Sequence, residues 1–244
     1  MRSFVTTLVF CIGFGASAAL AGPPYVTDDP EPTPYGHFEI YAFALGTEAR
    51  EGHGGETGID FNYGGADDLQ LTVVVPISYD APVRSKAIHG VGNIELAAKY
   101  RFLHQDDFGW DVSLFPSVAL PSFSMRIGEP HASFELPIWA QKDFGKWSTF
   151  GGGGCTLNNG GDSKDYCFGG WALTRQVLPS LNIGAEIYHQ TADAHGGKAS
   201  TGVGFGATYD LSENYHLMAS YGPGIQNAAK TGRTSWYAAL LMTF

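Results

Sequence analysis

The side chains that could do chemistry in this sequence are histidines, acids and cysteines, and their spacing matches no familiar metal or phosphate site. The 8 histidines stand singly, and neither His-x₃-His nor Cys-x₂-Cys, two spacings that hold metal ions, is present. Asp28, Asp29 and Glu31 could attract Ca²⁺, but the EF-hand pattern is missing. The stretch HGGKAST (195–201) lacks the full spacing of a phosphate-binding loop. We therefore expect no metal site and no cofactor.

The start of the chain has the three parts of a cleaved export signal. Arg2 precedes a short apolar run over residues 4–14, and an Ala-x-Ala site follows at 19–21. A membrane anchor is the alternative, but the run is too short and contains Gly13. Residues 1–21 are therefore predicted to be a signal peptide that is removed on export.

Two cysteines remain after that cleavage, because Cys11 lies inside the signal. Cys155 and Cys167 enclose eleven residues. An exported chain with two cysteines favours one disulfide, and two free thiols are the alternative. The stretch GGGGCTLNNGGDSKDYC (151–167) is expected to be a flexible outer loop closed by this bond.

The composition limits the possible partners. Arg2 is one of 14 basic residues, which leaves 13 against 24 acidic ones in the exported chain. This excess of acid argues against nucleic acid as a partner. The chain has 33 glycines and only 16% charged residues, yet it lacks the apolar run of about 20 residues that a membrane helix needs. Such a chain can cross a membrane only as a closed β-barrel.

The dominant pattern in the sequence is a period of two. In DLQLTVVVPISY (68–79), apolar side chains occupy every second position from Leu69 to Tyr79. The run has the length of a tilted transmembrane strand, about 9–11 residues. The same reasoning predicts twelve strands, an even number as in bacterial barrels, over 37–45, 56–63, 68–79, 93–102, 110–120, 133–141, 147–155, 167–177, 181–190, 200–209, 215–222 and 235–244.

The connections between these strands fall into two classes. Alternate connections are mostly short, at 64–67, 103–109, 142–146, 178–180 and 210–214. The others run longer, at 46–55, 80–92, 121–132, 156–166, 191–199 and 223–234. Short periplasmic turns and longer extracellular loops are typical of outer-membrane barrels, and so are the aromatic residues near the strand ends.

The expected fold is therefore all-β. We predict a twelve-stranded antiparallel transmembrane β-barrel over residues 36–244, surrounded by the lipids of a Gram-negative outer membrane. A soluble secreted β-protein is the alternative.

One parity of these strands carries the polar residues that would line the lumen. Its eight acids outnumber Lys99 and Arg101, so the interior would favour cations or neutral solutes and repel anionic aromatics. Alternatively, the acids pair with those two cations or with hydroxyls and only hold the interior together. Twelve strands predict a narrow, substrate-sized passage. The candidate lumen or solute-binding residues are Glu39, Tyr41, Glu56, Asp60, Asn62, Asp68, Gln70, Glu95, Lys99, Arg101, Asp111, Glu135 and Glu186.

The segment GPPYVTDDPEPTPY (22–35) precedes the first strand. Its five prolines in fourteen residues exclude a central strand and favour an extended chain. Either it is a disordered periplasmic tail, or it folds into the lumen as a plug in which Tyr25, Asp28 and Asp29 meet the wall.

Four stretches resemble a known family: GPPYVTDDPEPTPYGHFEIY (22–41), GIDFNYGGADDLQLTVVVPISY (58–79), FELPIWAQKDFGKWSTFGGGG (134–154) and GAEIYHQTAD (184–193). They are similar to the family described as the MetA-pathway of phenol degradation, over nearly the whole exported chain. The resemblance implies an outer-membrane, transporter-like barrel linked to the uptake of aromatic compounds. It carries over no catalytic motif, and the pair Cys155 and Cys167 is not expected in every member.

One histidine and one serine could form the catalytic pair of a hydrolase. His189 ends the predicted strand 181–190 and Ser200 begins the next, so base and nucleophile could meet across a hairpin. The His-x-Ser-Asn-Gly run of the outer-membrane phospholipase A family is absent, and a lone interfacial histidine is usually just an amphipathic side chain. We therefore expect a channel for small hydrophobic or aromatic solutes and no enzyme. A non-transporting structural or surface-interaction barrel is the main alternative, ahead of a lipid-directed hydrolase.

The chain stops on WYAALLMTF (236–244), without a polar tail. Trp236 and Phe244 belong to one apolar parity of the last predicted strand. Outer-membrane proteins commonly end on such an aromatic residue, which the barrel-assembly machinery reads, so these two residues are expected to act as an assembly signal. The strand itself is expected to pair with the first one, which leaves the barrel no open edge.

Overall fold

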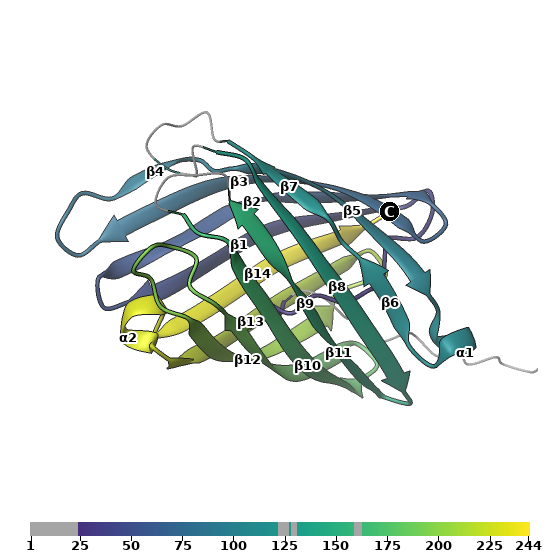
Figure 1. Ribbon diagram of the computed structural model, residues 1–244. Helices are drawn as coiled ribbons and strands as arrows, with labels where there is room; N and C mark the ends of the chain where they lie inside the picture. Colours follow the sequence, from purple (N-terminus) through teal and green to yellow (C-terminus); the bar gives the residue numbers. More distant parts are fainter. Residues whose placement is uncertain (1–23, 122–126, 128–130, 159–162) are drawn as a thin grey trace, which may run out of the picture.

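The structure is a computed structural model that describes residues 24–121, 127, 131–158 and 163–244. The predicted signal peptide lies outside the described residues. The described chain forms one antiparallel sheet that curls into a barrel (Figure 1). Its strands are β1 (Phe38–Ala49), β2 (Gly52–Ala66), β3 (Leu69–Pro82), β4 (Ile88–Val91), β5 (Ile94–Leu103), β6 (Asp111–Leu114), β7 (Ser117–Leu120), β8 (Ser133–Phe144), β9 (Trp147–Asn158), β10 (Tyr166–Leu178), β11 (Leu181–Gln190), β12 (Ser200–Asp210), β13 (Tyr215–Gln226) and β14 (Thr234–Thr243), with two single-turn helices, α1 (Gln105–Phe108) and α2 (Ala228–Thr231).

The barrel closes because its first and last strands pair. β1 lies between β2 and β14, with Tyr41 opposite Leu241 on β14 and Asp60 on β2. At the very end of the chain, Phe38 and Phe244 exchange two backbone hydrogen bonds of 2.8 and 3.0 Å. The last strand is thus the seam strand, and no edge of the wall is left unpaired there.

The wall has twelve positions, although fourteen strands are assigned. β6 and β7 share one position between β5 and β8, and β4 pairs with β3 alone. The interruption falls at Phe115 and Pro116, and Pro116 has no N–H to donate to the ladder. The register on either side of it is unchanged, so the predicted strand 110–120 is one strand with a local break. The prediction of a closed twelve-stranded antiparallel barrel is confirmed.

Two predicted loops are largely strand. The predicted loop 46–55 is wrong, because β1 and β2 continue through it to a two-residue turn after Ala49. Residues 47–56 (TEAREGHGGE) contain no large apolar side chain, so hydropathy could not reveal their pairing. The predicted flexible loop 151–167 is also wrong for most of its length, because β9 and β10 enclose only residues 159–165.

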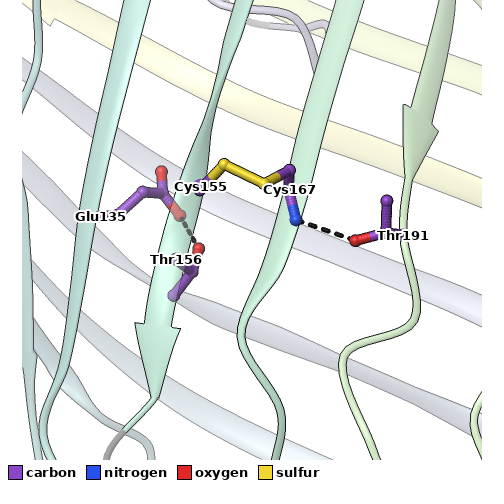
Figure 2. Close-up of a disulfide and its surroundings, with 5 residues drawn as sticks. All are labelled: Glu135, Cys155, Thr156, Cys167 and Thr191. Carbon is purple, nitrogen blue, oxygen red and sulfur yellow. Dashed lines mark hydrogen bonds between the residues drawn. A yellow bond between two sulfur atoms is a disulfide. The ribbon is translucent and has the colours of Figure 1, made fainter.

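The predicted disulfide is confirmed, and it joins neighbouring strands rather than loop ends. Cys155 on β9 lies directly opposite Cys167 on β10, with the Cα atoms 4.0 Å apart. Figure 2 shows the bond crossing from one strand to the next. Both cysteines are exposed and lie on the outward parity of the wall. The bond therefore locks the register of β9 and β10 from outside the barrel.

The two faces of the wall have opposite character. Outward positions expose large apolar side chains such as Ile59, Leu71 and Val75, as contact with lipid requires. Inward positions on the same strands carry buried polar groups such as Asn62 and Gln70. Among the described residues, no helix is both long enough and apolar enough to cross a membrane.

Candidate functional site

The segment before the first strand lies inside the barrel. Residues 24–35, called the inner segment below, start beside β13, where the hydroxyl of Ser220 donates to the carbonyl of Pro24 (2.6 Å). The hydroxyl of Tyr25 donates to the carbonyl of Gly206 on β12 (3.2 Å). The segment ends beside β2, where Tyr35 forms a bridge with Gly64. It therefore crosses the lumen from one wall to the other (Figure 1).

The first attachment of the inner segment is to β11 and is called the β11 anchor. The buried carboxylate of Glu186 accepts hydrogen bonds from the backbone N–H groups of Val26 (3.0 Å) and Thr27 (2.9 Å). It also accepts a bond from the hydroxyl of Thr27 (2.9 Å). Bonds to a charged acceptor are among the strongest that proteins form, at about 1.5–3 kcal/mol each. Three uncharged donors of the segment thus satisfy one wall carboxylate.

The second attachment is an ion pair with β5 and is called the β5 anchor. The ammonium of Lys99 lies 3.2 Å from a carboxylate oxygen of Asp28 and 3.8 Å from one of Asp29. Lys99 is 4% exposed and Asp29 is 3% exposed, so neither charge is solvated by bulk water. Burial raises the pKa of the Asp29 carboxyl above its usual range, and the neighbouring Lys99 acts in the opposite direction. The ring of Phe115 lies 4.7 Å from the same ammonium.

The third attachment, to β3, is uncharged. The amide oxygen of Gln70 accepts hydrogen bonds from the backbone N–H (2.8 Å) and the hydroxyl (3.0 Å) of Thr33. The amide nitrogen of Gln70 in turn donates to Asn62 (2.7 Å) and Thr72 (3.0 Å) on the wall. The side chain that receives the segment is therefore itself fixed by its neighbours.

Small residues on the wall make room for the inner segment. A Cβ atom added to Gly206 would lie 2.8 Å from the ring of Tyr25, and one added to Gly184 would lie 2.5 Å from its hydroxyl. A Cβ at Gly170 would overlap the side chain of Thr27. The ring of Tyr25 also packs edge-on against Phe150, with 5.9 Å between centroids. Shape complementarity therefore accompanies the polar bonds.

Several predicted lumen residues meet at one cavity beside the inner segment. The cavity measures about 140 Å³ and is lined by the segment, by Phe115 and by residues of β1, β2, β3, β5, β13 and β14. The hydroxyl of Tyr41 donates to Glu39 (3.4 Å), and the amide of Asn62 donates to Asp60 (2.9 Å). The structure thus brings six predicted wall residues together here: Glu39, Tyr41, Asp60, Asn62, Gln70 and Lys99.

A second group of predicted residues lies at the turn end of the barrel. The guanidinium of Arg101 is 2.9 Å from Asp68 and 3.7 Å from Asp111, and His104 is 3.1 Å from Asp68. The predicted strand position of Asp68 is wrong by one residue, because β3 begins at Leu69, but Asp68 still lines a pocket together with Arg101 and Glu31 of the inner segment. Asp68 instead occupies the turn with a left-handed φ of 61°, which aspartate tolerates better than most residues.

The remaining predicted acids lie toward the other end of the lumen, where the longer connections are. Glu56 accepts a hydrogen bond from Ser78 (2.6 Å), and Glu135 accepts one from Thr156 (2.9 Å). Glu95 is half-buried on β5, and β7 separates it from Glu135 on β8. On β7, Ala119 pairs with Glu95 and Ser117 pairs with Glu135, so the two acids lie on opposite sides of the same short strand. These three acids have no ion-pair partner among the described residues.

Sequence reasoning missed several partners of the inner segment. Thr27 and Thr33 donate to the wall, yet short hydroxyl residues in a proline-rich stretch look like ordinary linker composition. Ser220 and Phe150 are single inward positions on their strands, with nothing to mark them. A usable signal was the series of inward glycines at 170, 184 and 206, which predicts that backbone or a ring comes close to three neighbouring strands.

The residues considered for catalysis do not form one constellation. His189 contacts the hydroxyl of Thr201 (2.8 Å), its register partner, on the outward parity. Ser200 pairs with Gln190, so it belongs to the opposite parity of the wall. Within the described ranges, no group of three His, Cys, Asp or Glu residues could hold a metal ion.

Comparison with solved structures places the fold among outer-membrane barrels. The COG4313 outer membrane channel from Pseudomonas putida F1 has a TM-score of 0.73 and 14% identity, covering 88% of this chain and 98% of that chain. The translocator domain of the autotransporter NalP from Neisseria meningitidis (TM-score 0.44, 10% identity, 85% and 86% coverage) is more distant. Phospholipase A from the Escherichia coli outer membrane (0.43, 10%, 90% and 92%) is equally distant, and neither of these two supports an argument.

Sequence comparison is more specific. No curated protein matches the chain at a significant level. The profile of the family described as "Putative MetA-pathway of phenol degradation" matches residues 20–240, nearly the whole chain. The chain therefore belongs to this family, and its fold is that of an outer-membrane channel.

Proposed function

We propose that this barrel is an outer-membrane channel for small, uncharged aromatic or hydrophobic solutes, and that the inner segment is its plug. In this proposal the short connections face the periplasm and the longer ones face the outside. Outer-membrane lipids surround the barrel, the assembly machinery inserts it, and the solute passes through the lumen.

The single observation that carries the proposal is the attachment of the inner segment to opposite walls. Glu186, Lys99 and Gln70 lie on β11, β5 and β3, and each binds a different part of the segment. A disordered periplasmic tail would not be expected to bind three inward wall residues on separate strands. The family description and the fold of the Pseudomonas channel add support for a transport role.

The acidic lumen supports the choice of uncharged solutes. Both of its predicted cations are already paired, Lys99 with the inner segment and Arg101 with Asp68 and Asp111. An anionic solute would therefore meet lumen acids, while the two predicted lumen cations are already engaged by acids of the protein. Neutral aromatic solutes avoid this repulsion and can use the inward rings.

Planar-bilayer conductance tests the proposal. We expect the full chain to give small or rare openings and a variant lacking residues 24–35 to give large, frequent ones. Because that deletion could impair assembly, Lys99→Met and Glu186→Ala in the full chain provide a second route to an unplugged barrel. Heat-modifiable migration on gels checks that each variant is folded. No conductance in any folded variant would overturn the channel and favour a structural or surface-interaction barrel.

We also propose that the protein is not an enzyme. What supports this is the opposite parity of His189 and Ser200, which separates base from nucleophile. A phospholipase assay on the wild type and His189→Ala tests it. A wild-type rate above background that the substitution abolishes would overturn this part of the proposal.

A further inference from the structure

Lysine and arginine are unevenly distributed around the short-connection end of the barrel. Lys142 on β8 and Arg175 on β10 lie at outward positions near this end, and Lys146 is exposed in the turn between β8 and β9. These three residues are called the basic sector below. Other connections at the same end carry acids instead, such as Asp107 in α1 and Glu213 after β12. Positive charge on the outer face is therefore concentrated on one side of this end.

Both outward cations lie against tryptophan rings. The ammonium of Lys142 is 5.6 Å from the ring centroid of Trp110, and the guanidinium carbon of Arg175 is 5.0 Å from that of Trp147. Such contacts hold a cation over the face of a ring. Tryptophan prefers the boundary between membrane and water, where long cationic side chains direct their charge toward the lipid headgroups. The two charges are therefore held at headgroup depth.

A third tryptophan extends this aromatic surface. Trp171 packs edge-on against Trp110, with 6.3 Å between centroids. Its indole N–H donates to the hydroxyl of Thr149 (2.8 Å), and a Cβ atom added to Gly151 would overlap its ring. Three of the 5 tryptophans of the chain thus lie beside the basic sector. The wall fixes the position of the third ring by a hydrogen bond and by a glycine.

The charges of the basic sector are not neutralised by the protein. Among the described residues, no acid lies within 4.0 Å of any of its three cations. Asp106 and Asp107 of α1 come shortly before Trp110, yet they form no ion pair with the sector. The inward Arg101, at the same end, is by contrast engaged by Asp68. Lys142 and Arg175 also differ from the cations of the longer connections, because they lie on the lipid-facing wall itself.

We propose that the basic sector binds the headgroup of an anionic phospholipid in the leaflet that faces the periplasm. β8, β9 and β10 lie side by side (Figure 1), so Lys142 and Arg175 are two strand spacings apart, about 10 Å, which their long side chains can span. The phosphate is held by these cations, and the acyl chains lie along exposed apolar residues of the same strands, such as Ile138 and Leu173. Clusters of basic residues at a membrane surface attract anionic lipids in this way.

The same charges disfavour a zwitterionic lipid. Its headgroup carries an ammonium or choline cation, which the basic sector repels, whereas an anionic headgroup brings no such cation. The inference rests on the orientation in the proposed function, with the short connections toward the periplasm. It does not depend on whether the barrel conducts.

Quenching of tryptophan fluorescence by phospholipids with brominated acyl chains tests the inference, because three tryptophans lie beside the proposed site. The folded barrel is reconstituted in mixtures of phosphatidylglycerol and phosphatidylcholine, with one of the two lipids brominated. We expect phosphatidylglycerol to be preferred by about three- to tenfold at low salt. Because exposed charges are screened by salt, this preference should fall as ionic strength rises from about 50 to about 500 mM.

Substitutions of the cations leave the reporting tryptophans in place. Lys142→Gln and Arg175→Gln should each reduce the preference by about two- to threefold. Replacing all three cations of the basic sector with glutamine should abolish it. Arg175→Lys should retain most of it, because the charge is kept. Lys198→Gln, which removes an exposed cation from a long connection, is the matched control and should change nothing.

The outcomes separate this inference from the proposed function. Equal quenching by both lipids in the wild type, or a preference that persists in the folded triple variant, would overturn the lipid site. If the triple variant does not show heat-modifiable migration, equal losses in Arg175→Gln and Arg175→Lys would overturn the role of charge. A protease site inserted after Leu178 tests the orientation. Cleavage there in intact cells would overturn the orientation and the lipid site together, while conductance tests the channel independently.

Discussion

The β5 anchor and the β11 anchor hold the same segment by opposite means. At β5 the wall supplies the positive charge of Lys99 and the segment supplies two carboxylates. At β11 the wall supplies the negative charge of Glu186 and the segment supplies uncharged N–H and O–H donors. Each charged wall residue is thus matched by the groups that face it, within four consecutive residues of the segment, 26–29.

The difference teaches how the two anchors should respond to change. Removing one partner of a buried ion pair is strongly destabilising, because the other charge stays buried without a compensating charge. A carboxylate bound by uncharged donors leaves only N–H and O–H groups behind when it is removed, and water can satisfy these. The β5 anchor should therefore be the more sensitive one, although fewer hydrogen bonds are formed there.

Replacing the ammonium of the β5 anchor is the strongest test of this comparison. Lys99→Met leaves Asp28 and the buried Asp29 without their cation, which should destabilise the docked inner segment by about 3–5 kcal/mol. We expect a large rise in channel conductance and in cleavage of the segment by proteinase K. Both readouts are measured on barrel that still shows heat-modifiable migration.

Two further variants make the result interpretable. Arg175→Met removes an exposed cation that stacks on Trp147 outside the lumen and should leave both readouts unchanged. Adding Asp28→Asn and Asp29→Asn to Lys99→Met should partly restore docking. An inner segment that stays protected in Lys99→Met would show that the ion pair does not hold it.

Removing the carboxylate of the β11 anchor should have the next largest effect. Glu186→Ala deletes three hydrogen bonds, but the freed donors of Val26 and Thr27 can bind water that enters the space. We expect docking to weaken by about 2–3 kcal/mol, on the scale of one charge-assisted bond. Conductance should rise less than in Lys99→Met. Glu56→Gln, an inward acid bonded to Ser78, is the control. A larger effect for Glu186→Ala than for Lys99→Met would reverse the comparison.

The sequence predicted the barrel well because lipid imposes a period of two on every spanning strand. Runs such as 68–79 show it directly, and the seam strand could be recognised from its apolar parity. Beyond the membrane this constraint vanishes, which is why the paired residues 46–55 looked like a loop. The break at Pro116 was missed because the alternation resumes in the same phase after Phe115 and Pro116, so the two short strands resemble one.

The site was harder to predict than the fold. Hydropathy showed that Glu186 and Lys99 face inward, but pairing across a lumen depends on three-dimensional positions that alternation does not contain. The partners in the inner segment are single residues of a proline-rich stretch without periodicity. Asp68 was misplaced because the hydropathy pattern does not report the left-handed turn that removes it from the strand.

The fit of Tyr25 beside the β11 anchor offers a smaller test, based on shape. In Gly206→Ala the new Cβ would lie 2.8 Å from the ring of Tyr25 and 2.9 Å from Pro24. Moving the ring should cost about 1–3 kcal/mol of docking energy, which raises conductance moderately. In a Tyr25→Ala background the same substitution should add less. Equal effects in both backgrounds would mean that Gly206 matters to the wall rather than to the segment.

The smallest expected effect comes from two threonine hydroxyls, which separate charge from hydrogen bonding. Thr27→Val removes a bond to the carboxylate of Glu186, and Thr33→Val removes one to the neutral amide of Gln70. Bonds to charged groups contribute about 1.5–3 kcal/mol and neutral ones about 0.5–1.5 kcal/mol. Thr27→Val should therefore open the channel more often than Thr33→Val, as measured by open probability in the same bilayers. Both hydroxyls are almost fully buried, so a difference in their exposure to water does not affect the comparison of the two variants. Equal open probabilities would mean that the charge of Glu186 adds nothing at this site, and the β11 anchor would then be equivalent to the uncharged attachment at β3.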